Sequence, residues 1–235
     1  MDFGRVFKEA LPLLLNGLGT TVIIALISIA AGMVLGLISC LFGMSKVKIL
    51  RGISAVYIWI IRGTPMIVQA FLIFFAIPQL IQLMNPGFRL DAFTAGCITL
   101  SLNAGAYMSE IFRAGIQAID KGQMEAARSL GLSKTQAMRK IILPQAFKIS
   151  IPPMVNQFII TVKDTSILSV IGLAEIVNKA KQYVGKTYQF FATYILVAAF
   201  YLIVISILMV ISKFVEKKFS YESESKRHRS QKGIR

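Results

Sequence analysis

Charged residues are scarce in this chain of 235 residues, making up 16% of the sequence against about 25% in ordinary soluble domains. The scarcity is concentrated, because residues 20–44, 63–88, 92–109 and 187–212 contain no Asp, Glu, Lys or Arg at all. Each of these runs approaches or exceeds the roughly 20 apolar residues that a helix needs to cross a bilayer. The sequence therefore predicts an all-α, polytopic membrane protein.

Histidine and cysteine are nearly absent, with one His and two Cys in the whole chain. Cys40 and Cys97 fall inside predicted spans without a basic partner, and His228 lies in the charged tail. An intramembrane enzyme needs a convergent nucleophile and base or a metal cluster. We therefore expect no catalytic residue and no metal site.

The apolar runs, bounded by turn and charge signals, predict about five transmembrane helices. Pro65 should kink or break the second of them near Thr64, because proline removes a backbone donor. Gly32 and Gly36 have the G-x-x-x-G spacing of close helix contact, expected here within the chain. The expected segments are an external piece at 1–16, a membrane domain at 17–212 with spans at 17–43, 52–84, 91–112, 149–171 and 188–212, and a basic tail at 213–235.

The net charge of +15 is distributed unevenly. Lys and Arg gather in 44–51, in 113–148 and in the tail, as expected for cytoplasmic segments under the positive-inside rule. This predicts a multi-pass membrane protein with the N-terminus outside and the C-terminus in the cytoplasm. Three lysines at 174–187 fall on the external side. A nucleic-acid module is not supported, because no soluble domain is present to carry it.

The cytoplasmic loop 113–148 is predicted to fold. Asp120 precedes Gln123, and Ser133 precedes Gln136, at the spacing of capping boxes. We expect two short helices that are separated at Gly131, the second ending near Pro144. A structured loop of this kind is typical of a docking surface.

The same loop resembles a known family. Glu125-Ala126-Ala127, followed by Gly131, Ile141 and Leu143-Pro144, is similar to the "EAA" signature of binding-protein-dependent ABC importer permeases. In that family the segment is a coupling helix that inserts into a cleft of the ATP-binding subunit. The resemblance implies that Ala126, Ala127 and Gly131 permit close approach, that Glu125 and Arg128 supply polar contacts, and that Leu143 and Pro144 complete the motif.

Further segments extend the resemblance over nearly the whole chain. These segments are Asn16–Thr21, Ile61–Pro65, Ser109–Ile116 and Lys163–Ser166. They resemble the corresponding segments of the branch of the family that imports polar amino acids such as histidine, glutamine, arginine or cystine. The resemblance implies a non-catalytic subunit of the bacterial cell (inner) membrane, without a cofactor of its own. Its partners would be a pair of ATPase subunits that bind ATP and Mg, a second permease subunit (a second copy or a paralogue), an external solute-binding protein, the amino acid and membrane lipid.

Polar residues within the spans mark a candidate solute path, since they are costly unless they face an interior. Asn103, Tyr107 and Glu110 share one face of the third predicted helix, and Gln157, Thr161 and Asp164 repeat that spacing on the fourth. Asp164 or Glu110, with Asn103, could bind the ammonium of an amino acid. Arg62, Thr64 or Ser166 could bind its carboxylate. The alternative is that Glu110 and Arg113 are interfacial charges near the cytoplasmic end, and that Lys163 and Asp164 form a structural ion pair with Arg62.

Residues 180–187 match a relaxed phosphate-loop pattern, ending in Gly185-Lys186-Thr187. A true phosphate loop follows a strand and opens a soluble helix, whereas this segment precedes a membrane span, so we interpret the match as coincidence. A secondary transporter of a small polar solute remains the alternative function. Such a transporter would be expected to have internal repeats and more spans, and it has no need of the loop motif.

Overall fold

The computed structural model describes residues 3–232, and the side chains of residues 3–218. Within this part of the chain the secondary structure is helical and contains no strand. The α-helices are α1 (Phe3–Gly43), α2 (Lys48–Gly63), α3 (Met66–Phe71), α4 (Ile77–Gln82), α5 (Ala92–Gln117), α6 (Lys121–Ser129), α7 (Lys134–Ala137), α8 (Leu143–Asp164), α9 (Ile176–Thr187) and α10 (Phe190–Lys232). Two π-helical turns, Leu72–Ala76 and Met138–Ile142, and a 3-10 helix, Thr165–Ile171, continue the neighbouring helices.

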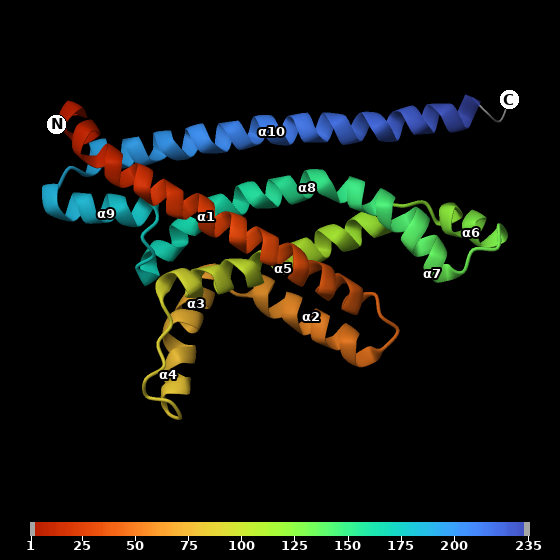
Figure 1. Cartoon of the computed structure of the whole chain (residues 1–235), viewed down its shortest axis with the longest axis horizontal. Coiled ribbons are helices and arrows are strands. Elements are labelled where there is room, and N and C mark those ends of the chain that lie inside the picture. Colours follow the sequence, from red (N-terminus) through yellow and green to blue (C-terminus); the bar gives the residue numbers. More distant parts are fainter. Residues whose placement is uncertain (1–2, 233–235) are drawn as a thin grey trace.

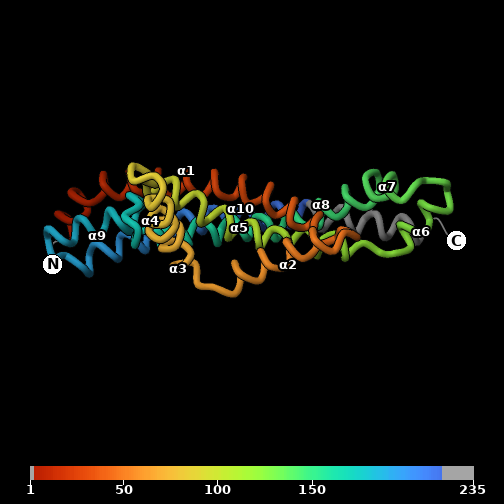
Figure 2. The backbone as a smooth tube through the Cα atoms, turned by 90° about the horizontal axis from the view of Figure 1, so that it is seen from below, coloured from red at the N-terminus to blue at the C-terminus, as the bar shows by residue number. Residues whose placement is uncertain are grey.

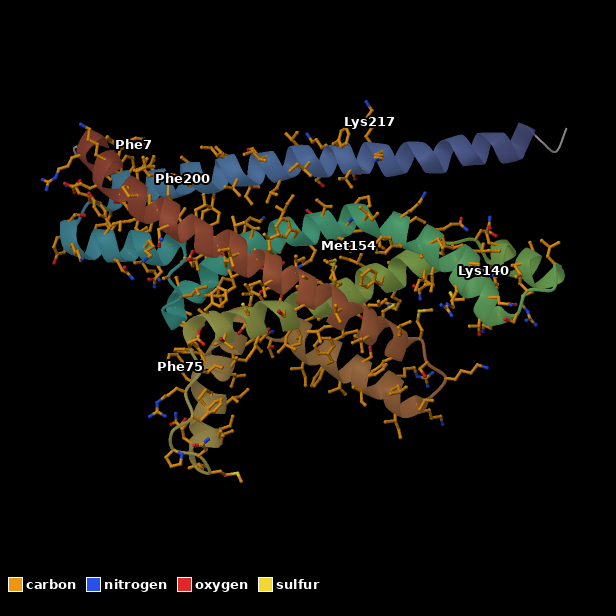
Figure 3. All side chains as sticks on the ribbon, in the orientation of Figure 1. Phe7, Phe75, Lys140, Met154, Phe200 and Lys217 are labelled. Carbon is orange, nitrogen blue, oxygen red and sulfur yellow. The ribbon has the colours of Figure 1, made fainter. Side chains whose placement is uncertain are left out.

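The long helices α1, α5, α8 and α10 run lengthwise through the molecule (Figure 1). One end, the loop end, carries α6, α7, the link between α1 and α2, and the C-terminus. The other end, the α9 end, carries α9 and the N-terminus, as the second view also shows (Figure 2). The basic segments 44–51, 113–148 and the tail therefore lie at the same end, where Lys140 is seen in Figure 3.

Within residues 3–232, three helical segments are long and apolar enough to cross a membrane alone, namely Phe3–Gly43, Lys134–Ile171 and Phe190–Lys218. The pair α2 and Met66–Gln82 would be a fourth if its two arms form one span. α5 is long enough but lies in the middle of the molecule, where half of its residues are buried and many are small or polar. It runs beside α1 and α8, which pack against it and shield it from the surroundings.

The predicted span 52–84 is interrupted close to Thr64, where the sequence predicts a break. The chain breaks after Gly63, as Pro65 predicts, but the following segment turns away by 107°. We call this segment, residues 66–82, the arm; it projects sideways from the bundle and carries Phe75 (Figure 3). Thr64 is extended because the proline ring disfavours helical backbone in the residue before it.

Three other predicted boundaries also need correction: those of the N-terminal segment, of the second loop helix and of the interval 174–187. α1 begins at Phe3, so 1–16 is not a separate segment ahead of the first helix, although residues 1–2 lie outside the described part. The second loop helix does not end near Pro144, because the π-helical turn leads directly into α8. Pro144 occupies the first turn of α8, where a missing backbone N–H costs little. The interval 174–187 contains a helix, α9, in place of a polar connection.

The contact between α1 and α5 is the most extensive between any two elements of the described chain. A Cβ atom added at Gly32 would lie 2.8 Å from Ala104 Cβ, and one added at Gly36 would lie 2.5 Å from Met108 Cβ. Both distances are far shorter than a van der Waals contact, so the glycines allow the two backbones to approach closely. The expectation that this G-x-x-x-G pair packs within the chain is confirmed.

We predict that Gly36→Ala lowers the melting temperature of the detergent-solubilised protein, because the new methyl group overlaps α5. Overpacking of this kind typically costs about 1–3 kcal/mol. The matched control is Gly19→Ala, also in α1, where an added Cβ meets nothing within 4 Å. The control should melt at or above the wild-type temperature, since alanine favours the helix. Equal melting of the two variants would contradict the packing role.

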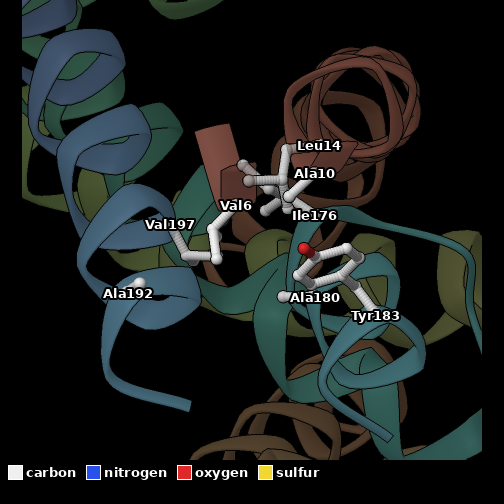
Figure 4. Close-up of a cluster of buried hydrophobic side chains, with 8 residues drawn as sticks. All are labelled: Val6, Ala10, Leu14, Ile176, Ala180, Tyr183, Ala192 and Val197. Carbon is white, nitrogen blue, oxygen red and sulfur yellow. The ribbon is translucent and has the colours of Figure 1, made fainter. Parts of the chain in front are cut away.

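At the α9 end, buried apolar residues join α1, α9 and α10 into one cluster (Figure 4). Its members are Val6, Ala10, Leu14, Ile176, Ala180, Tyr183, Ala192 and Val197. Beside it, the fully buried Glu175 caps α9, accepting hydrogen bonds from the backbone N–H groups of Val177 (2.9 Å) and Asn178 (2.6 Å). Desolvation outweighs these bonds and raises the pKa of Glu175 to about 7.

A raised carboxyl pKa means that the folded protein holds this proton more tightly than the unfolded chain does. The contribution of Glu175 is therefore most favourable near or below pH 4.5, its ordinary pKa, and declines as the pH rises to about 7. We predict that Glu175→Gln flattens the fall in melting temperature between pH 5 and pH 8. Thermal melts across that range, with Asp91→Asn as a control at an exposed helix cap, would measure the difference. Parallel curves for wild type and Glu175→Gln would refute it.

Candidate functional site

The break between α2 and α3 leaves backbone carbonyl groups without helical partners, and a buried glutamine satisfies them. Gln69 Nε2 donates hydrogen bonds to the carbonyl oxygens of Ile61 (2.7 Å) and Thr64 (3.0 Å). The Thr64 hydroxyl donates to the Ile60 carbonyl oxygen at 2.8 Å. The sequence prediction missed Gln69; the available signal was a lone amide within an apolar run, four residues after Pro65. Its role is to fix the backbone of the break.

A cavity of about 370 Å³, which we call the central cavity, opens beside this break. It contains five of the predicted path residues, Arg62, Thr64, Asn103, Tyr107 and Asp164. Gln157 from α8 also lines it, as its shared face with Asp164 suggests. α2, α5 and α8 thus bring an anionic group, amides and a cation to one space.

The structure separates Glu110 from that group. Glu110 lines a second cavity of about 520 Å³, the inner cavity, which extends between α5 and α8 toward the loop end. Glu110 lies 3.5 Å from Arg62 and makes shorter contacts with Arg113. The proposed pairing of Arg62 with Asp164 is therefore wrong, because Arg62 pairs with Glu110. Ser166 lines neither cavity and donates instead to the Lys163 carbonyl oxygen at 2.7 Å.

The loop between α5 and α8 is folded as predicted. Asp120 caps α6 by accepting from the Gly122 N–H at 2.7 Å, and Ser133 forms a complete capping box with Gln136 at the start of α7. The box expected at Asp120 is thus replaced by a single cap bond. Gly131 has a φ of 84°, and the Leu132 N–H donates to the Ala127 carbonyl oxygen at 3.2 Å, closing α6 in a Schellman turn.

The residues of the EAA signature divide into an outer and an inner set. Glu125, Ala126 and Arg128 are exposed on α6, while Ala127 is 2% exposed and packs inward. Leu130, just before Gly131, is 83% exposed, so it does not join the packed side of the helix. The loop tip therefore presents charged groups, small residues and one large apolar side chain. Leu143 and Pro144 lie at the base, in the first turn of α8.

Residues 180–187 lie in α9, where their backbone follows an α-helix rather than a phosphate-binding loop. The rejection of this segment as a nucleotide site is confirmed on that point. Among the described residues, no group of three or more His, Cys, Asp or Glu side chains is placed to hold a metal ion.

The family pattern for the binding-protein-dependent transport system inner membrane component matches residues 28–221, so the chain belongs to this family. The arginine transport system permease protein ArtQ of Bacillus subtilis is 38% identical over 93% of this chain and 97% of that protein. The L-cystine transport system permease protein TcyB, also of B. subtilis, is 40% identical over 88% and 86% of the two chains.

A crystal structure described as an amino acid ABC transporter with histidines contains a similar chain. That chain is 39% identical and has a TM-score of 0.86, covering 93% of this chain and 99% of its own length. The predicted resemblance and the all-α, polytopic fold are both confirmed.

We predict that Gln69→Glu destabilises the break, because a carboxylate would place oxygen atoms against the carbonyl groups that the amide now satisfies. An unsatisfied buried polar group typically costs about 1–3 kcal/mol. Gln79→Glu, on the exposed side of the arm, is the matched control and should behave as wild type. Melting temperature and yield of folded protein in detergent would measure the effect. Wild-type stability of Gln69→Glu would argue against the role of the amide.

Proposed function

We propose that this chain is the transmembrane subunit of an ATP-driven importer and forms the translocation path for a polar L-amino acid. The observation that carries the proposal is the composition of the central cavity. Asp164, Asn103 and Gln157 offer acceptors for an ammonium group, and Arg62 offers donors for a carboxylate. Its volume of about 370 Å³ is within the roughly 300–1,000 Å³ of small-molecule sites.

The second part of the proposal concerns the source of energy. The exposed surface of α6 with Leu130 is suited to dock into a cleft of a separate ATPase. Two such subunits would bind ATP and Mg²⁺, and this chain would bind no cofactor. Closure of the ATPase pair would push the α6–α7 loop and rock the helices between inward and outward access.

The remaining partners follow from the family and from the surface of the chain. A second permease subunit, either another copy or a paralogue, would cover the apolar faces that α2 and the arm leave exposed. An external solute-binding protein would deliver the amino acid at the α9 end. The basic segments at the loop end support a cytoplasmic location for that end and for the C-terminus, and hence an external N-terminus.

A secondary transporter would use the same cavity but would have no use for a folded docking loop. The two functions are separated by reconstituting the chain with its ATPase and binding protein and measuring ATP hydrolysis with a panel of polar amino acids. Histidine, glutamine, arginine and cystine are the first to test. Stimulation by one of them, with uptake that stops without ATP, is expected. Uptake that follows an ion gradient and ignores ATP would favour the secondary transporter.

The cavity itself is tested by Asp164→Asn in the same assay. Loss of one charge-assisted contact, about 1.5–3 kcal/mol, should raise the half-saturating amino acid concentration by roughly tenfold or more. Asp91→Asn, at the exposed cap of α5, is the matched control and should leave that concentration unchanged. An unaltered concentration in Asp164→Asn would remove Asp164 from the binding site.

For the loop, we predict that Gly131→Val uncouples ATP hydrolysis from uptake. A β-branched residue resists the left-handed backbone at this position, at a cost of about 1–2 kcal/mol, so the turn between α6 and α7 should change shape. Gly131→Asn is the matched control, since asparagine tolerates this conformation. The ratio of amino acid transported to ATP hydrolysed should fall for valine and stay near wild type for asparagine. An unchanged ratio for valine would contradict the coupling role.

A further inference from the structure

The central and inner cavities share part of one wall. Arg62, Tyr107 and Gln157 line both of them. On α5, Asn103 lines the central cavity but not the inner one, and Glu110 lines the inner cavity but not the central one. The shared side chains therefore stand where a solute would pass from the central cavity toward the loop end. We call Arg62 and Tyr107 the partition.

Charge holds the partition in place. The Arg62 guanidinium lies 3.5 Å from Glu110 Oε2, and its carbon atom lies 5.3 Å from the centre of the Tyr107 ring. The ion pair with Glu110 thus links α2 to α5 between the two cavities. The face of the Tyr107 ring attracts the Arg62 cation in addition. Neither cavity has another cation among its lining residues in the described chain.

Glu110 has a second and tighter partner. Arg113, one turn further along α5, donates to both carboxylate oxygens, at 3.1 and 2.5 Å. The contact with Arg62 is longer than a normal hydrogen bond. Arg62 can therefore leave Glu110 without leaving an unpaired carboxylate behind, which is the costly outcome in a site of this kind. The arrangement makes Arg62 the movable member of the three.

A solute carboxylate in the central cavity would compete with Glu110 for the same guanidinium. Arginine binds carboxylates in a two-pronged geometry that is stronger than a single long contact. We propose that Glu110 is a positioning residue: it holds Arg62 across the path, and the carboxylate of the amino acid draws Arg62 away and opens the way to the inner cavity. This proposal rests on the proposed function, since it requires a solute that carries a carboxylate.

The opening can be measured as access to the central cavity from the loop end. Cys40 and Cys97 are replaced by alanine, and Ile160→Cys places one thiol in the wall of the central cavity alone. The complex, without ATP, is labelled in inverted membrane vesicles with a membrane-impermeant cationic methanethiosulfonate. The ligands are L-arginine and L-glutamine, each paired with its decarboxylated analogue, agmatine or 4-aminobutanamide; disulfide ligands are left out because they exchange with the thiol.

The transported amino acid should speed labelling about fivefold, the factor that corresponds to about 1 kcal/mol for a partly exposed ion pair. Its decarboxylated analogue should have no effect. Glu110→Gln should label rapidly without any ligand and gain nothing from the amino acid. Glu9→Gln, which alters an ion pair with Arg5 near the α9 end, should behave as the parent.

Arg113→Gln provides a result that misfolding cannot imitate. With Arg113 removed, Glu110 depends on Arg62 alone, so labelling should become slower and the amino acid concentration that accelerates it should rise. The proposal is overturned if Glu110→Gln labels at the parent rate, or if the decarboxylated analogue accelerates labelling as much as the amino acid. Failure of the proposed function would look different: no amino acid would stimulate ATP hydrolysis, while the ligand-free comparison of the variants would still report on the partition.

Discussion

The close approach of α1 and α5 is the contact on which the other helices depend. Gly32 and Gly36 allow α5 to lie against α1, and this leaves the opposite side of α5 free for polar residues. Asn103, Tyr107 and Glu110 can then face α2 and α8 instead of lipid. A helix with this many small and polar residues would be a poor solitary span, but it is stable once its neighbours exclude the bilayer.

The break at Pro65 is the second determinant of the site. It ends α2 at the level of the cavities, so Arg62 projects from the last turn of a helix instead of from a continuous rod. Gln69 supplies the hydrogen bonds that the missing turn would have made. In a membrane interior, where water is scarce, this replacement is what permits an irregular backbone at all.

Much of this architecture could be predicted from the sequence, because charge-free runs and proline act locally. The position of the break, the folded loop and the cap at Ser133 all follow from neighbouring residues. The 107° turn could not be predicted, since its direction depends on packing. Nor could the separation of Glu110 from Asp164, because the two carboxylates lie on different helices. Which of them pairs with Arg62, on a third helix, depends on how the helices pack. The helix end predicted near Pro144 is wrong because proline is common in the first turn of a helix as well as after its end.

The start of α8 directly after the π-helical turn has a mechanical consequence. From Met138 to Asp164 the chain is continuously helical, first as a π-helical turn and then as α8, and α8 alone is about 33 Å long. A movement of α7 along this axis would therefore be carried toward Asp164 by one helix instead of through a loop. Pro152 and Pro153 lie inside that helix, so it can bend about midway between the base of the loop and the central cavity.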